Sequence, residues 1–220
     1  MLIFDRNPTL QAMESEHKWI VVRIDGKIAA VSTDYRLLAS ISATLAKGNK
    51  GSKKGKARNE NGQIYDNITA TAADLEEVWK LKQESTWDDL FLFGTEFQKK
   101  VWRKLWDLSH QENGTSQNTG LISYSDFAEL CQNRAGVRAV AHAIGLNPVS
   151  VIIPCHLVIP KESIDKIKEI HKKAEATIFK GDDLCINSIL SDSSIDFGEY
   201  TLGRKLKRKL ILKELANGLL

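Results

Sequence analysis

The chain has 220 residues, 42% of them hydrophobic and 27% charged, with a formal net charge of +3. These values fit a globular, soluble protein of one compact unit or two small ones, and no run is apolar and long enough to span a bilayer. The N-terminus also lacks a secretory signal pattern. The cysteines, Cys131, Cys155 and Cys185, form no C-x-x-C pair, so we expect no disulfide framework, no structural zinc and a reducing compartment.

The N-terminal part is predicted to form a small sheet lobe over residues 1–88. Residues 18–32 read as a β-hairpin, because two β-rich runs flank the turn pair Asp25-Gly26. Residues 35–46 are expected to form a short helix. A basic, glycine-rich segment at 47–63 is interpreted as a flexible loop; a solvated linker is favoured over a DNA-backbone contact or a nuclear-import signal.

A second domain is predicted over residues 89–220. A helix is expected at 73–83 at the end of the first lobe, and another begins near Thr95, which with Gln98 fits a capping box. Phe97, Val101 and Leu105 recur at helical spacing in this second helix.

Residues 121–146 predict two short helices, the first N-capped by Ser123, with a break at Q-N-R-A-G. This arrangement fits a helix-turn-helix. The second helix is rich in alanine, which suits close approach to a DNA groove, although close helix packing is the simpler interpretation of those residues alone. Residues 161–196 are interpreted as an insertion, and the last helix is predicted to bury Leu202, Leu206 and Leu210 beneath a basic outer face.

The run V-I-I-P-C-H-L-V-I-P, residues 151–160, places Cys155 beside His156 within an apolar segment. A buried cysteine is ordinarily core filler, and burial raises a thiol pKa, which opposes reactivity. Neighbours in an extended chain point to opposite faces, so the pair could work only at a turn or through a bridging water. A third group would then have to orient the imidazole.

The motifs P-C-H-L-V-I, G-T-E-F-Q-K-K-V-W, I-S-Y-S-D-F-A-E-L, R-A-V-A and N-P-V-S-V-I-I-P-C-H, with Y-T-L-G near the end, resemble those of the O6-alkylguanine-DNA alkyltransferases. That family repairs methylated guanine. The resemblance covers roughly residues 90–160 and 197–218, in family order. It implies an α+β fold, with a ribonuclease-H-like antiparallel-sheet lobe and a mainly helical lobe that carries the helix-turn-helix.

The resemblance implies direct, single-turnover transfer of the alkyl group to a cysteine, with no cofactor and no metal. It assigns Cys155 as acceptor, His156 as water-mediated base, Glu214 as the acid that orients the histidine and Asn147 as a hinge brace. Tyr124 would assist the leaving guanine and the rotation of the nucleotide.

The resemblance also implies a double-stranded DNA partner that contains O6-alkylguanine, bound by a monomer with no membrane association. Arg138 would fill the gap left by the flipped base, with Ser125 and Asn133 as further DNA contacts. Tyr200 and Thr201 would line the alkyl pocket. We expect a nuclear location, or a cytoplasmic one if the source is bacterial.

Two departures from the family pattern stand out. Leu157 replaces the motif arginine, which is expected to affect stability or rate, and His142 and Ile144 occupy positions that are usually small. A damage-binding protein that recognises alkylguanine without repairing it is the alternative function, although such relatives replace the cysteine. A cysteine hydrolase is a second rival.

Overall fold

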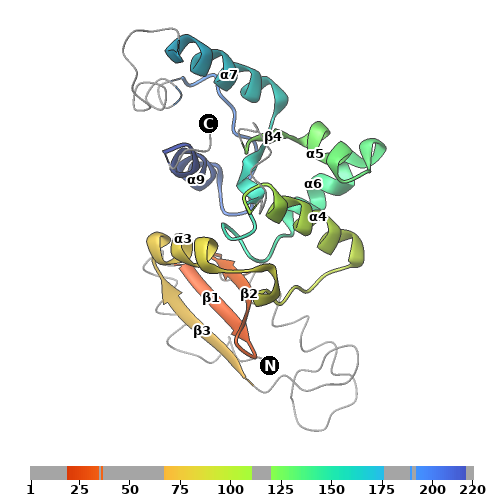
Figure 1. Ribbon diagram of the computed structural model, residues 1–220, viewed down its shortest axis with the longest axis vertical. Helices are drawn as coiled ribbons and strands as arrows, with labels where there is room; N and C mark the ends of the chain where they lie inside the picture. Colours follow the sequence, from red (N-terminus) through yellow and green to blue (C-terminus); the bar gives the residue numbers. More distant parts are fainter. Residues whose placement is uncertain are drawn as a thin grey trace. The chain divides into compact units, whose positions relative to one another are not determined.

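The computed structural model describes residues 19–34, 36, 67–110, 120–175, 189 and 192–216. The chain is α+β, with a three-stranded antiparallel sheet in its N-terminal part and a mainly helical C-terminal part (Figure 1). It forms two compact units, one of residues 1–95 and 147–153, the other of residues 96–146 and 154–220. The expected helix at 35–46 and the basic loop at 47–63 lie outside the described residues, apart from residue 36.

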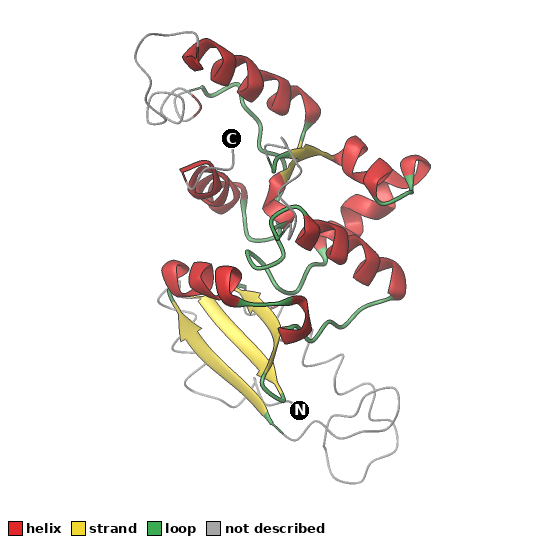
Figure 2. Cartoon of the chain, in the orientation of Figure 1, coloured by secondary structure: helices red, strands yellow, loops and turns green. Residues whose placement is uncertain are grey.

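The predicted hairpin is confirmed. Strand β1 (Trp19–Ile24) pairs antiparallel with β2 (Lys27–Ser32). The turn pair has positive φ at both positions, 49° at Asp25 and 82° at Gly26, as a two-residue hairpin with right-handed strand twist requires. A third strand, β3 (Ile68–Ala73), pairs with the other edge of β1 and gives the order β2-β1-β3 (Figure 2).

Helix α3 (Leu75–Glu84) follows β3 directly. Asp74 caps it: the Asp74 carboxylate accepts from the Glu77 amide and the Glu77 carboxylate accepts from the Asp74 amide, both at 2.8 Å. This reciprocal capping box explains why the helix begins two residues later than the predicted start at 73. The residues of β1 and β2 are almost all buried, whereas most of β3 is exposed.

Residues 147–153 join the sheet unit although they come much later in the chain. Val149 forms a parallel bridge with Val31, whose amide donates to the Pro148 carbonyl at 2.9 Å. The apolar run 151–160 is buried, but its first part is not extended, because the chain turns back and the Ile153 amide donates to the Val149 carbonyl at 2.9 Å. Val151 has φ 73°, a strained conformation for a β-branched residue.

The second unit is built from helices around one short parallel strand pair, β4 with β5. Its elements in chain order are α4 (Glu96–Asp107), β4 (Ile122–Ser123), α5 (Tyr124–Leu130), the 3-10 turn η2 (Arg134–Gly136), α6 (Val137–Gly145), the 3-10 turn η3 (Cys155–Leu157), β5 (Val158–Ile159), α7 (Lys161–Glu175) and α9 (Arg204–Ala216). None of the described helices is long and apolar enough to cross a membrane.

Helix α4 packs against α6, and the indole of Trp102 donates to the Ala143 carbonyl at 2.8 Å. Val101 and Leu105 are buried, as their spacing predicted. Phe97 is 38% exposed instead, so the buried stripe does not extend to the first turn of the helix.

The segment predicted as an insertion contributes to the core. Helix α7 buries Ile164 and Ile167 against the fully buried Leu157, and Ile189 and Ile195 belong to the same cluster. The described part of residues 161–196, predicted as a partly helical insertion, is therefore packed into the core of this unit.

The predicted stripe of the last helix also needs correction. Leu202 precedes α9, and the buried face consists of Lys207, Leu210, Ile211, Glu214 and Leu215. Two charged side chains of α9 are therefore buried: Glu214, to which the resemblance gave a role, and Lys207, to which the sequence analysis gave none.

Candidate active site

Cys155 and His156 lie in η3, a single 3-10 turn closed by a bond from the Leu157 amide to the Pro154 carbonyl at 3.0 Å. Cys155 is 5% exposed and His156 is fully buried. The sequence predicted that Cys155 and His156 could work together only at a turn or through a water, and the structure places them in a turn. Their side chains therefore do not alternate as they would in an extended strand.

The imidazole of His156 is held by an acid from the last helix. The His156 Nε2 atom lies 2.8 Å from Glu214 Oε1, and both side chains are buried. A buried carboxylate needs such a partner, since an unpaired charge in the interior is very costly. With the carboxylate accepting, Nε2 carries a proton, and Nδ1 is the basic atom of the neutral ring.

Two tyrosines, Tyr200 and Tyr124, interact with Cys155. The Cys155 thiol donates to the Tyr200 hydroxyl, with 3.9 Å between sulfur and oxygen. Tyr124 is the half-buried first residue of α5, and burial raises the pKa of its phenol above 10.0, with the Cys155 charge as a second cause. The Tyr124 phenol therefore stays protonated at neutral pH and can donate.

Lys207 is the residue that sequence reasoning missed. Its buried ammonium donates to the Val158 carbonyl at 2.8 Å, the Glu199 carbonyl at 3.2 Å and the Tyr124 hydroxyl at 3.4 Å. Burial lowers the pKa of Lys207 to about 8, and the nearby Cys155 opposes that shift by Coulomb attraction. A signal was present, because Lys207 stands seven residues before Glu214 and so lies on the same helical face.

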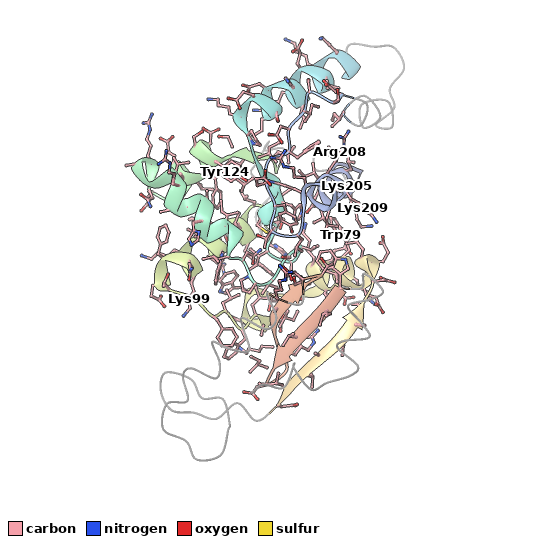
Figure 3. All side chains as sticks on the ribbon, turned by 180° about the vertical axis from the view of Figure 1, so that it is seen from behind. Trp79, Lys99, Tyr124, Lys205, Arg208 and Lys209 are labelled. Carbon is pink, nitrogen blue, oxygen red and sulfur yellow. The ribbon has the colours of Figure 1, made fainter. Side chains whose placement is uncertain are left out.

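Other basic residues of α9 differ in exposure: Lys205 and Lys209 are exposed, whereas Arg208 is half-buried and lies over the Phe197 ring. Figure 3 labels Lys205, Arg208 and Lys209 along this helix, and Tyr124 on α5. Because Lys207 belongs to the same run of charges, its inward direction could not be read from composition alone.

The predicted DNA-contacting residues form a separate group on α5, η2 and α6. Arg138 is exposed in the first turn of α6, and Ser125 is exposed on α5, where its hydroxyl lies 2.9 Å from that of Ser123. Asn133 lies in the break, and its side chain occupies the space that a Cβ at Gly136 would need. Of the two unusual residues in α6, His142 is exposed whereas Ile144 is buried.

Asn147 belongs to the sheet unit and not to the unit of the cysteine. Its amide donates to the Ile153 carbonyl at 2.8 Å and its oxygen accepts from the Val149 amide at 3.0 Å. The side chain thus holds the turn that leads directly to Pro154 and Cys155, which fits the expected brace. Its role in the reaction stays a prediction.

Among the described residues, no group of three or more His, Cys, Asp or Glu side chains could hold a metal ion.

Residues 96–176 match the family model of the 6-O-methylguanine DNA methyltransferase, DNA binding domain. Over this range the chain is similar to the 6-O-methylguanine DNA methyltransferases. The matched range includes Tyr124, Arg138, Asn147, Cys155 and His156, but ends before Tyr200 and Glu214. The Glu214 contact with His156 is therefore an observation of the structure alone.

Individual relatives agree with the family match. A methylated-DNA–protein-cysteine methyltransferase of Kluyveromyces lactis is 34% identical over 95 residues, 43% of this chain and 43% of the relative. One from Methanosarcina mazei is 33% identical over 110 residues, 50% of this chain and 65% of the relative. The chain thus spans less than two thirds of either relative.

Among solved structures, the O6-methylguanine-DNA methyltransferase of Pyrococcus kodakaraensis is similar with a TM-score of 0.43 and 20% identity, over 88% of this chain and 89% of that chain.

Proposed function

We propose that the protein repairs O6-alkylguanine in DNA by moving the alkyl group onto Cys155, once per molecule. One observation carries the proposal. The turn that holds Cys155 also places His156 beside it, and the His156 ring is fixed by Glu214 at 2.8 Å. This is the nucleophile, base and orienting group that an activated thiol requires.

The reaction balances without a cofactor. His156, through a water, takes the thiol proton, and the thiolate sulfur attacks the alkyl carbon. A carbon–sulfur bond forms as the bond from that carbon to O6 breaks, and the electron pair leaves with guanine. The Tyr124 phenol donates to the developing guanine anion. A thioether remains on Cys155, so the protein is consumed.

The helices α5 and α6 would act as a helix-turn-helix on DNA. The support is their packing across the η2 turn, the exposure of Arg138 and the DNA-binding domain to which the family model corresponds. O6 is inaccessible within a duplex, so the nucleotide must rotate out of the stack, and Arg138 would occupy the vacated space. Ser125 and Asn133 would contact the backbone nearby.

We further propose that the sheet unit is the family's ribonuclease-H-like lobe, with Asn147 as the brace before the cysteine turn. The antiparallel order β2-β1-β3 supports this lobe assignment. A monomer and a nuclear location complete the proposal, and both are open to direct measurement.

Mass spectrometry of the intact protein tests the transfer. Incubation with a duplex that contains O6-methylguanine should add one methyl group, mapped to Cys155 and absent from Cys155→Ser. Cys131→Ser is the matched control and should still be methylated, because burial raises the pKa of Cys131 to about 11 and keeps it a thiol at neutral pH.

The same experiment separates the rival functions. A damage-binding protein would bind the lesion and keep its mass, and a hydrolase would turn over more than once per molecule. Either result would remove the transfer proposal.

A further inference from the structure

A short loop carries Tyr200 to the sulfur of Cys155. Residues 198–203, named here the Tyr200 loop, are bounded by Gly198 with φ 77° and Gly203 with φ 95°. These values are easy only for glycine, so the chain enters and leaves the loop in conformations that other residues resist. Within the loop, the Gly203 amide donates to the Tyr200 carbonyl at 2.9 Å.

The near side of the loop is fixed to α9. The Lys207 ammonium donates to the Glu199 carbonyl at 3.2 Å, and the Glu199 carboxylate pairs with Arg204. These contacts hold residue 199, immediately before Tyr200, against the helix that also carries Glu214.

The far side of the loop is fixed to α6. The Thr201 hydroxyl donates to the Gly145 carbonyl at 2.8 Å, and Gly145 is the last residue of α6. The carbonyls of a final helical turn have no partner within their helix, so an outside donor is well placed there. Trp102 from α4 holds the Ala143 carbonyl of the same turn at 2.8 Å.

The neighbouring residues Tyr200 and Thr201 therefore contact different parts of the protein. Tyr200 reaches the acceptor sulfur, whereas Thr201 reaches the helix proposed to enter DNA. A displacement of the end of α6 would move Thr201 and with it the preceding residue Tyr200, because the Gly203–Tyr200 turn bond leaves this short segment little freedom.

We propose that Thr201 is a positioning residue that couples α6 to the Tyr200 loop, so that duplex DNA on α6 sets the position of Tyr200 beside Cys155. The coupling rests on the proposed function, in which α6 binds DNA. Under this proposal, duplex DNA bound to α6 orders the Tyr200 loop beside Cys155. A free alkylated base does not contact α6 and therefore reacts while the loop is less ordered.

Hydrogen exchange with an undamaged duplex tests the coupling without any transfer step. Binding should slow amide exchange of residues 199–203 in the wild-type protein and in Thr201→Ser, which keeps the hydroxyl. Thr201→Val has nearly the same shape without the donor and should lose this protection. Equal protection of the loop in Thr201→Val would overturn the proposal.

The rate of transfer supplies a second readout. Thr201→Val should slow repair of duplex substrate roughly two- to tenfold more than it slows reaction with free benzylguanine, as expected for loss of one hydrogen bond. Equal slowing with both substrates would make Thr201 a pocket residue only. Failure of the wild-type protein to bind duplex would remove the proposed function and this coupling together, whereas bound duplex with Thr201-independent exchange would remove the coupling alone.

Discussion

Replacing Lys207 with methionine should change how stability depends on pH. Lys207 has a pKa of about 8 in the folded protein against an ordinary value of 10.5. The unfolded chain therefore binds more protons than the folded chain between these two values. The free energy of unfolding should rise with pH across this window, and one pKa unit corresponds to about 1.4 kcal/mol. The difference gives an increase of about 3 kcal/mol in total.

The sign has a direct physical meaning. Below pH 8 the folded protein keeps a buried ammonium whose desolvation is offset only in part by the carbonyls of Val158 and Glu199. Above that pH the folded state releases the proton and the cost disappears, whereas the unfolded lysine stays charged up to about pH 10.5.

Urea denaturation from pH 7.5 to 10.5, with a reductant present, measures the effect. The stability of the wild-type protein relative to Lys207→Met should rise by about 3 kcal/mol across the window. Lys205→Met, exposed on the same helix, is the control and should follow the wild-type curve. Parallel curves for the wild type and Lys207→Met would refute the reasoning, because they would show that residue 207 binds its proton equally well in both states.

Three further substitutions probe separate parts of the protein. Arg138→Ala should slow duplex repair on the order of tenfold more than reaction with free benzylguanine, since only the duplex leaves a gap to fill; equal slowing would make Arg138 structural. Glu214→Gln should slow benzylguanine transfer roughly tenfold at neutral pH and shift the rate profile to higher pH, since a neutral amide supports a charged imidazole less well; an unchanged profile would remove Glu214 from the mechanism. Leu157→Arg should lower the free energy of unfolding by about 3–5 kcal/mol in urea, because the new charge would be buried without a partner; Leu157→Met should cost far less, and an unchanged midpoint for Leu157→Arg would contradict the burial argument.

Local features of the fold could be predicted because short-range chemistry determines them. Asp25-Gly26 specified the hairpin, and Ser123 specified the start of α5, where its hydroxyl accepts from the Asp126 amide at 3.0 Å. The proximity of Glu214 to His156 came from a resemblance and not from any local rule, since 58 residues separate them.

The features that sequence reasoning missed depend on distant contacts. The tight turn at Val149–Ile153 is fixed by Asn147 and by the bridge to β2, and neither contact can be read from the apolar composition of the segment. A helix was predicted within residues 161–196 and α7 forms there, but its packing in one cluster with Leu157 could not be predicted, because Leu157 comes from another element.

Helix α9 shows why a basic run can be misread as a surface. Lys207 and Glu214 lie on one inner face, seven residues and about 10 Å of helix rise apart. That separation exceeds the reach of a direct ion pair, so the two buried charges do not neutralise each other. Each is instead satisfied by a different part of the site, Lys207 by Tyr124 and the chain around it, Glu214 by His156. The same helix therefore places the Lys207 ammonium beside the Tyr124 phenol and the Glu214 carboxylate beside the His156 imidazole. The seven-residue spacing keeps these two interactions independent of each other.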